Sequence, residues 1–159
     1  MKTEIRNAIL SDGERIIALL EQIGEYHHRG RPDIFKGGIK KYTPDDFKEI
    51  LANPARPIFS AVGKDSGEVL GYAFCEIISY KDHPVFRDIK TLYIDDLCVD
   101  EKCRGMGIGF LLVEKCKAFA KDAGCYNIDL NVWEFNHSAV KFYEKCGMTV
   151  QRRRLEFIL

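Results

Sequence analysis

The longest regular patterns of apolar residues in the chain have the spacing of helices. The first lies in residues 14–23, where an apolar face is formed by Ile16, Ile17, Leu19, Leu20 and Ile23. These positions recur at the three- to four-residue spacing of an amphipathic helix. Ser11 is expected to be its N-cap, with Glu14 three positions later completing a capping box. Gly24 is expected to end the helix, because glycine commonly follows the last helical residue.

Three further helices are expected in the rest of the chain. Thr43 and Pro44 have the order of an N-cap and a first helical residue, and the helix that they begin has a buried side of Phe47, Ile50 and Leu51. A longer helix ends at Gly124, and its apolar face comprises Ile108, Leu112, Cys116, Phe119 and Ala123. Asn136 is the expected cap of a short helix before Gly147, with the apolar positions Ala139, Val140, Phe142 and Cys146.

Shorter apolar runs between the helices predict strands at residues 4–10, 57–62, 69–79, 91–99, 128–132 and 148–158. Residues 64–67, Lys-Asp-Ser-Gly, form a hairpin turn between the second and third of these strands. The order of elements indicates an α/β (α+β) fold with helices on both faces of the sheet. We expect a mixed, mostly antiparallel, twisted sheet of six to seven strands, in a single domain of residues 1–159.

The charge balance bears on which macromolecules the protein can bind, and the cysteines bear on its cellular compartment. Lysine plus arginine and aspartate plus glutamate both number 24, so no net field attracts nucleic acid or an anionic membrane. The three arginines at 152–154 alternate between the two sides of an expected strand and make no single basic patch. The six cysteines lack metal-ligand spacing and several lie in apolar stretches, which is typical of buried thiols in a reducing compartment. We therefore expect a cytoplasmic protein without nucleic-acid or membrane partners and without a metal.

A turn crowded with glycine stands between the expected strand at 91–99 and the long helix. It consists of Arg104, Gly105, Met106, Gly107, Ile108 and Gly109. Unpaired amides at a helix N-terminus bind anions, so the turn predicts a phosphate cradle. The Walker pattern would need Lys and Ser or Thr after the last glycine, and the dinucleotide fingerprint would need glycine at 110. Phe110 and Leu111 stand there instead. A plain glycine-rich turn, or a site for another nucleotide, stays open on this motif alone.

Two motifs together resemble the GNAT N-acetyltransferase superfamily. The turn at residues 104–109 matches that family's Arg/Gln-x-x-Gly-x-Gly/Ala signature, and residues 136–148, NHSAVKFYEKCGM, resemble its Asn-x-x-Ala-x-x-Phe-Tyr helix. Residues 93–99 look like its fourth strand. The resemblance covers nearly the whole chain, is strongest at residues 91–148, and implies a GNAT-like fold that uses acetyl-CoA as co-substrate.

The resemblance also implies roles for individual residues in holding acetyl-CoA. Main-chain amides of residues 104–109 would bind the pyrophosphate. The pantetheine arm would pair, like an added strand, with main-chain groups of Leu97, Cys98 and Val99. Asn136 would hydrogen-bond the same arm, although its type and position equally suit a plain N-cap.

Two residues are candidates for acid–base catalysis. Tyr143 corresponds to the family's general acid, which would donate a proton to the departing thiolate; its alternative role is an aromatic core pair with Phe142. Asp95 is the candidate base, directly or through a held water. Asp95 and Asp96 are neighbours on a strand, so we expect only one to face the cleft unless a bulge intervenes. Either carboxylate could instead be structural.

The implied reaction is transfer of acetyl from acetyl-CoA to a primary amine by direct attack in a ternary complex. The acceptor is a small amine such as a polyamine, or a protein amine. Its pocket would involve the irregular residues 26–42 and the aromatic pair Trp133 and Phe135. The residues 26–42 include His27, His28, Arg31 and Asp33, which simple exposure also explains.

Three alternatives to this reading remain. A ping-pong route through Cys98 has no base paired with that thiol in the sequence. A non-catalytic CoA-binding or sensory module of the same fold is the main rival function. A homodimer is one expected state, because homodimers are common among the resembling enzymes.

Overall fold

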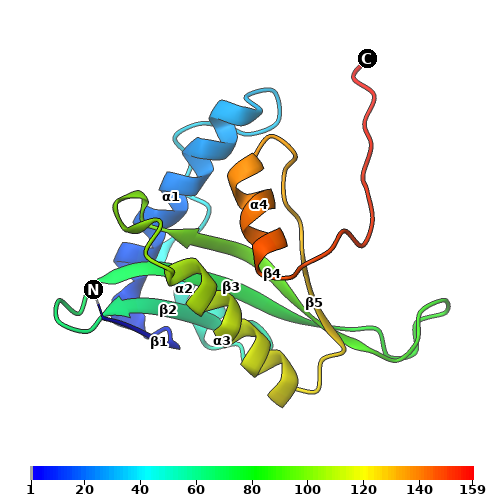
Figure 1. The fold of residues 1–159 in the computed structure, drawn as a ribbon, viewed down its shortest axis with the longest axis horizontal. Helices are drawn as coiled ribbons and strands as arrows, with labels where there is room; N and C mark the ends of the chain where they lie inside the picture. The colour runs from blue at the N-terminus through cyan, green and yellow to red at the C-terminus, as the bar shows by residue number, and fades with distance from the viewer. Residues whose placement is uncertain (1) are drawn as a thin grey trace.

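A computed structural model describes residues 2–159 and shows a five-stranded twisted sheet with helices on both faces (Figure 1). The strands follow one another in sequence order across the sheet: β1 Thr3–Asn7, β2 Ile58–Gly63, β3 Val69–Ser79, β4 Lys90–Val99 and β5 Asn127–Leu130. The helices are α1 Gly13–Gly30, α2 Pro44–Leu51, α3 Ile108–Asp122 and α4 His137–Lys145, with short 3-10 turns at Leu10–Asp12 and Glu101–Cys103.

The sheet is mixed and mostly antiparallel, as expected. β1 to β4 pair antiparallel with their neighbours, and β5 alone pairs parallel with β4. The parallel step requires a crossover, and α3 supplies it on one face of the sheet. The hairpin expected at residues 64–67 joins β2 and β3, where Gly67 has the positive φ of 70° that such a turn favours.

The strand expected at residues 148–158 is wrong, which leaves five strands rather than six to seven. This segment has no regular structure and leaves the body as the red extended chain in Figure 1. Leu155 and Phe157 on it are 89% and 88% exposed. Alternating apolar residues give only a preference for strand, and a strand also needs a hydrogen-bonded neighbour. The segment makes an ion pair between Glu156 and Arg31 instead.

The first helix begins and ends differently from the expectation. Ser11 lies inside a 3-10 turn and caps nothing; the Asp12 carboxylate accepts a hydrogen bond from the Ile9 amide at 3.0 Å. Asp12 is fixed there by Arg6 and Ser60, whose donors lie 2.6 and 2.9 Å from it. Gly24 lies in the middle of α1. An interior glycine costs only about 1 kcal/mol relative to alanine, so it does not stop a helix whose apolar stripe is buried.

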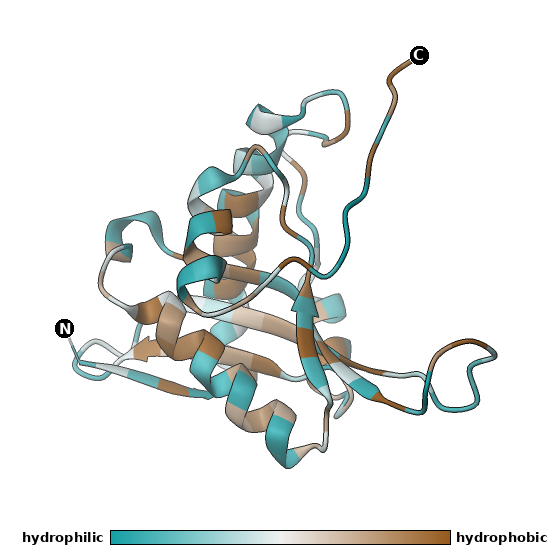
Figure 2. Ribbon diagram, turned by 45° about the vertical axis from the view of Figure 1, so that its right-hand side comes forward, coloured by the Kyte–Doolittle hydropathy of each residue, from teal (hydrophilic) through white to brown (hydrophobic). Residues whose placement is uncertain are grey.

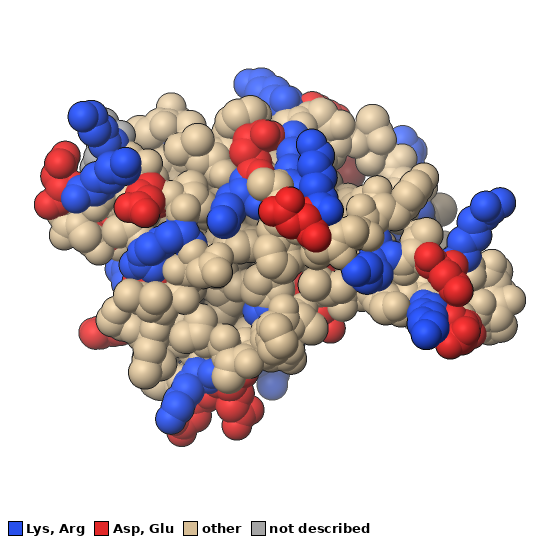
Figure 3. Space-filling model, turned by 90° about the horizontal axis from the view of Figure 1, so that it is seen from below, with Lys and Arg blue, Asp and Glu red and all other residues tan. Residues whose placement is uncertain are grey.

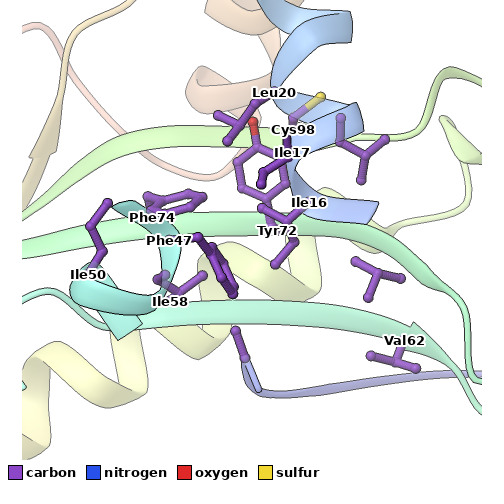
Figure 4. Packing of buried hydrophobic residues seen from close by; sticks show 13 residues of the cluster. Ile16, Ile17, Leu20, Phe47, Ile50, Ile58, Val62, Tyr72, Phe74 and Cys98 are labelled. Atoms are coloured by element: carbon purple, nitrogen blue, oxygen red, sulfur yellow. The ribbon is translucent and has the colours of Figure 1, made fainter. Parts of the chain in front are cut away.

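The apolar faces of the helices bury the two sides of the sheet (Figure 2). α1 and α2 cover one side; in Figure 4, Phe47 of α2 and Phe74 of β3 point toward one another. α3 covers the other side with Ile108, Leu112, Cys116 and Ala120. Thr43 caps α2 as expected, accepting from the Asp46 amide at 3.1 Å. β4 leads into the glycine turn at residues 104–109, and β5 leads into the turn before α4.

Charged side chains of both signs are interspersed on the face seen in Figure 3. Within residues 2–159, no helix has the length and apolar content needed to cross a membrane.

Candidate active site

The pairing between β4 and β5 ends at the middle of β4. Their parallel pairing runs from Thr91 with Asn127 to Ile94 with Leu130 and stops there, while β4 continues to Val99. On its other side, β4 stays paired with β3 as far as Val99 with Gly71. Among residues 2–159, no strand therefore pairs with the edge of β4 that faces away from β3 over residues 95–99. This is where an extended ligand could add as a strand.

Leu97, Cys98 and Val99, the three residues expected to hold such a ligand, differ in the direction of their side chains and in the hydrogen bonds of their main-chain groups. Leu97 and Val99 pack their side chains toward α3. The Val99 carbonyl accepts from Gln22 Nε2 at 3.3 Å and from Arg104 Nε at 3.4 Å. Cys98 points to the opposite side, into the cluster under α1. The Val99 carbonyl thus already accepts hydrogen bonds from two side chains. The carbonyls of Leu97 and Cys98 accept none of these side-chain hydrogen bonds.

The Cys98 thiol is a poor nucleophile. Its side chain is buried, and Gln22 Nε2 lies 3.4 Å from its sulfur. Burial, with the nearby Asp96 carboxylate, raises the pKa of Cys98 to about 12, against the opposing effect of Arg104. The thiolate is the reactive form of cysteine, so these surroundings disfavour a ping-pong route through an acetylated Cys98.

The glycine turn opens α3 and is shaped for close approach by a ligand. Gly105 and Gly107 have φ of 78° and 79°, and a Cβ built on either would meet nothing within 4 Å. The glycines are required by the left-handed backbone rather than by crowding. α3 starts at Ile108, immediately after Gly107, so its free first amides open onto this space. An anion such as pyrophosphate fits this donor set.

Gly109, the third glycine, has a different role. A Cβ there would lie 3.1 Å from Cζ of Phe142 in α4 and 3.8 Å from Cγ2 of Val99. Its bare backbone thus lets α4 lie directly against the start of α3. The two halves of the sequence signature, at residues 104–109 and 136–148, are in contact through this pair.

Asn136 is the N-cap of α4, as expected. Its Oδ1 accepts from the Ala139 amide at 3.2 Å and from the Ser138 hydroxyl at 3.0 Å. The hydroxyl of Tyr26 in α1 donates to the same oxygen at 3.3 Å, which ties the two helices that lie side by side in Figure 1. These bonds explain why asparagine stands here. Its contact with a pantetheine arm stays a prediction.

Tyr143 lies on α4, half-buried, with its ring 5.0 Å from the ring of Phe142. Burial, and then the negative charge of Asp96, raise the pKa of Tyr143 well above the usual value for tyrosine. The phenol is therefore protonated at neutral pH and can donate a hydrogen bond or a proton. Its position is compatible with both roles that the sequence left open. The ring packs against Phe142, as in an aromatic core pair, and the phenol is a proton donor on which the charge of Asp96 acts.

Asp95 and Asp96 face the same side of the sheet, which corrects the expectation from strand alternation. Phe74 pairs with Asp96 and Cys75 pairs with Ile94, so Asp95 is an extra residue in β4. Such a bulge shifts every later side chain to the other face. Ile94 accordingly packs toward α3, whereas Cys98 packs toward α1. The bulge sits where β5 separates from β4.

Lys41, from the segment before α2, lies over the two carboxylates. Its Nζ is 3.0 Å from Asp95 Oδ2 and 3.2 Å from Asp96 Oδ2. The hydroxyls of Tyr42 and Tyr72 donate to Asp95 and Asp96 at 3.4 and 3.0 Å. Asp96 is the more buried of the two, with its side chain 11% exposed against 29% for Asp95.

The electrostatics of this cluster follow from its burial. Burial raises the pKa of Asp96, although Lys41 and the Tyr72 hydroxyl oppose the shift. Burial also opposes the charge of Lys41, but Asp96 and Asp95 outweigh it and raise the pKa of that ammonium. A cation at this position is thus strongly favoured.

Aromatic side chains of α1, of the segment after it and of the turn before α4 pack on one another and form an aromatic wall. His27 of α1 stacks on Phe35 with ring centroids 5.1 Å apart, and Phe35 meets Trp133 edge to face at 5.0 Å. Phe135 stacks on Trp133 at 6.0 Å. Burial lowers the pKa of His27, with Asp96 opposing and Lys41 adding to the shift. The wall brings residues 26–42 together with the turn before α4. Its role as an acceptor pocket stays a prediction.

The segment 26–42 is only partly irregular, because residues 26–30 are the last residues of α1. Its other polar residues have structural partners. His28 Nδ1 lies 2.7 Å from the Phe35 carbonyl. Arg31 bonds Asp33, with Nη2 2.8 Å from Oδ2, and also bonds Glu156. These two side chains shape the loop, and neither contacts the paired carboxylates. Both histidines are half-buried rather than simply exposed.

The sequence did not single out Lys41, Tyr42 or Tyr72. Lys41 and Tyr42 lie in a stretch without periodicity, so no pattern marked them. A tyrosine such as Tyr72 in a fully buried strand is a usable signal, because a buried hydroxyl needs a polar partner. Within residues 2–159, no three His, Cys, Asp or Glu side chains gather as a metal site would require.

The model of the acetyltransferase (GNAT) family matches residues 20–148 of this chain. That range includes the glycine turn, the bulged part of β4 and α4. It ends just before the extended C-terminal segment.

Similar proteins carry names that agree with this match. The peptidyl-lysine N-acetyltransferase YjaB of Escherichia coli (strain K12) is 35% identical over 154 residues, 96% of this chain and 86% of that protein. The thialysine N-epsilon-acetyltransferase of Bos taurus is 28% identical over 146 residues, 90% of this chain and 82% of its own. The solved structure of a tetramutant of the BH1408 protein from Bacillus halodurans superposes with a TM-score of 0.92, at 31% identity, over 98% of this chain and 99% of that one.

Proposed function

Because the chain belongs to the acetyltransferase (GNAT) family, we propose that it transfers the acetyl group of acetyl-CoA to a primary amine by direct attack within a ternary complex. It is an acyltransferase by this membership. The observation that supports the proposal most strongly is the position of Tyr143, half-buried on α4, the helix whose Phe142 packs against Gly109 of the glycine turn.

The residues present suit acetyl-CoA as co-substrate. The amides that open α3 after Gly107 offer donors for its pyrophosphate, and the left-handed Gly105 and Gly107 leave room for that group. The edge of β4 beyond Ile94 offers main-chain groups to an extended pantetheine arm. Acetyl-CoA supplies an activated acyl group as a thioester. The protein supplies binding, orientation and proton transfer.

The proposed reaction needs one base and one acid. The acceptor ammonium loses a proton to a carboxylate or to a water that it holds, and the free amine attacks the thioester carbonyl. A carbon–nitrogen bond forms and the carbon–sulfur bond breaks. The departing thiolate, whose conjugate acid has a pKa of about 8.5, takes a proton from the Tyr143 phenol. The tyrosinate then recovers a proton from solvent.

Asp95 is the better candidate for the base. It is more exposed than Asp96, so a water can reach it and carry the proton away. Asp96 is held by the Tyr72 hydroxyl and lies deeper. We infer that Asp96 mainly keeps negative charge in the site, while Asp95, directly or through water, receives the proton.

A thiol-release assay over a panel of amines tests the proposal. We expect CoA to appear with at least one primary amine, in a one-to-one ratio with acetylated product. A chain that binds acetyl-CoA but releases no thiol above the buffer rate with any amine would instead be a non-catalytic CoA-binding module. A thermal-shift comparison of acetyl-CoA, ATP and NAD addresses the other rival, because only the expected co-substrate should raise the melting temperature.

A further inference from the structure

The ammonium of Lys41 sits between the two carboxylates of the β4 bulge. Its distances of 3.0 Å to Asp95 and 3.2 Å to Asp96 are those of hydrogen-bonded ion pairs. The ring of Tyr42 lies under the same ammonium, with 5.3 Å from Nζ to the centroid. Charge, hydrogen bonds and an aromatic face thus converge on one position for a primary ammonium.

This position also lies beside the expected chemistry. The charge of Asp96 acts on the Tyr143 phenol and on His27 of the aromatic wall. The bulge that brings Asp95 to the same face lies where β4 loses its β5 partner. An acceptor amine bound in place of the Lys41 ammonium would therefore lie beside the bulged part of β4, along which the thioester is proposed to bind.

Lys41 is not required there by the fold. Its side chain is 40% exposed and reaches the site from the irregular segment before α2. Each carboxylate also has a second partner, because Asp96 accepts from the Tyr72 hydroxyl and Asp95 from the Tyr42 hydroxyl.

We propose that Asp95 and Asp96 form the subsite for the ammonium of the acceptor, and that Lys41 occupies this subsite in the free protein as an internal stand-in. The inference rests on the proposed function and specifies its substrate class. The acceptor is an aliphatic primary amine on a flexible, unbranched alkyl chain, the chemistry that lysine itself presents. It binds by displacing the Lys41 side chain, and the aromatic wall of His27, Phe35 and Trp133 contacts its alkyl part.

The test compares Lys41→Met with the matched variant Lys40→Met. Methionine keeps an unbranched apolar chain and removes the charge. Lys40 is the sequence neighbour, 68% exposed and paired with Glu21 at 3.2 Å, outside the site. Calorimetric titration with 1,4-diaminobutane, in the presence of CoA, should show about tenfold tighter binding to Lys41→Met than to the wild type, a difference of about 1.4 kcal/mol. Lys40→Met should bind as the wild type does.

Two further measurements make the result specific. Lys41→Gln should show the same gain, and adding Asp96→Asn to Lys41→Met should abolish it. A second titration uses a short peptide with one lysine, and the tighter of the two ligands identifies the source of the amine. Equal or weaker amine binding by both Lys41 variants would overturn the proposal.

The failures of the two proposals are distinguishable. If the wild type transfers acetyl groups but the Lys41 variants gain no affinity, the subsite is wrong and the proposed function stands. If the variants bind the amine more tightly but neither they nor the wild type release thiol, the subsite stands and acetyl transfer is wrong.

Discussion

Asp95 and Asp96 are adjacent in the chain, yet their carboxylates lie on one face of the sheet and share a single ammonium. The β-bulge at Asp95 produces this arrangement, because it inserts one residue opposite the Phe74–Cys75 step of β3. It brings two negative charges to one face, where the charge of Asp96 acts on the Tyr143 phenol and on His27. A regular strand would have sent one of the two carboxylates to the α3 side.

Replacing Tyr143 by phenylalanine removes the proposed proton donor and keeps the ring. We expect kcat to fall about 100-fold, within the usual range for loss of an acid catalyst, with the Kd for CoA nearly unchanged. Steady-state kinetics and calorimetry measure the two quantities. Tyr126→Phe is the control, since Tyr126 is 77% exposed and lies just before β5 rather than on α4. An undiminished kcat for Tyr143→Phe would remove the general-acid role.

Replacing Gly107 by valine should abolish CoA binding, because the side chain enters the space in front of the α3 amides. It also strains a backbone with positive φ, at a cost of about 1–2 kcal/mol. Gly67→Val is the matched control, since Gly67 has a φ of 70° and equally open surroundings in the β2–β3 turn. Calorimetry should show binding by Gly67→Val only. Normal CoA binding by Gly107→Val would contradict the cradle.

Replacing Phe47 by alanine should destabilise the fold by about 3–5 kcal/mol, the usual cost of deleting a buried aromatic ring. Phe47 is 1% exposed and joins α2 to Phe74 of the sheet. Phe157→Ala, on the exposed C-terminal segment, should change the free energy of unfolding by less than about 0.5 kcal/mol. Urea unfolding followed by circular dichroism measures both. Similar losses for the two variants would show that the segment packs on the body.

The lowered pKa of His27 makes a prediction about pH. Burial disfavours its charged form in the folded chain, so the unfolded chain binds more protons between the folded pKa and the ordinary value of about 6.5. The contribution of His27 to the free energy of unfolding is therefore greatest above pH 6.5. It decreases as pH falls from 6.5 toward the folded pKa, by up to about 1.4 kcal/mol per pH unit.

His27→Gln should flatten this dependence. Urea unfolding between pH 8 and pH 5 should give a shallower slope for the variant below pH 6.5, with parallel curves above it. Asp96, which favours the charged His27, and Lys41, which disfavours it, both act on this histidine. Identical slopes for the two proteins would show that His27 is not desolvated in the folded state.

Periodicity and capping residues were sufficient for most of the fold. The buried stripes of α1 and α3 and the cap at Thr43 were correctly predicted, because each depends on neighbours a few residues away. The predicted helix end at Gly24 was wrong, because the free-energy cost of one glycine inside a helix is smaller than the gain from burying more of the helix's apolar face. The last strand failed for a related reason: whether residues 148–158 pair with β5 depends on the sheet edge and not on their own alternation.

The candidate site was predictable only where it is a contiguous motif. The glycine turn and the Asn136 cap are read directly from neighbouring residues, and the structure brings them into contact through Gly109 and Phe142. The position of Asp96 could not be predicted, because a one-residue bulge reverses the alternation of a strand. Lys41 reaches the site across more than 50 positions in the sequence, a distance over which no local pattern carries information. The expected homodimer and cytoplasmic location stay predictions.

The most direct test of the account is a rapid-quench experiment with a single turnover of acetyl-CoA labelled in its acetyl group, analysed by mass spectrometry. Direct transfer predicts that labelled N-acetyl amine appears at the same rate as CoA. It also predicts that no labelled acetyl group is found on the protein at any time point. A labelled acetyl-protein that forms before the product and decays into it, or CoA release without an acetylated amine, would contradict the account.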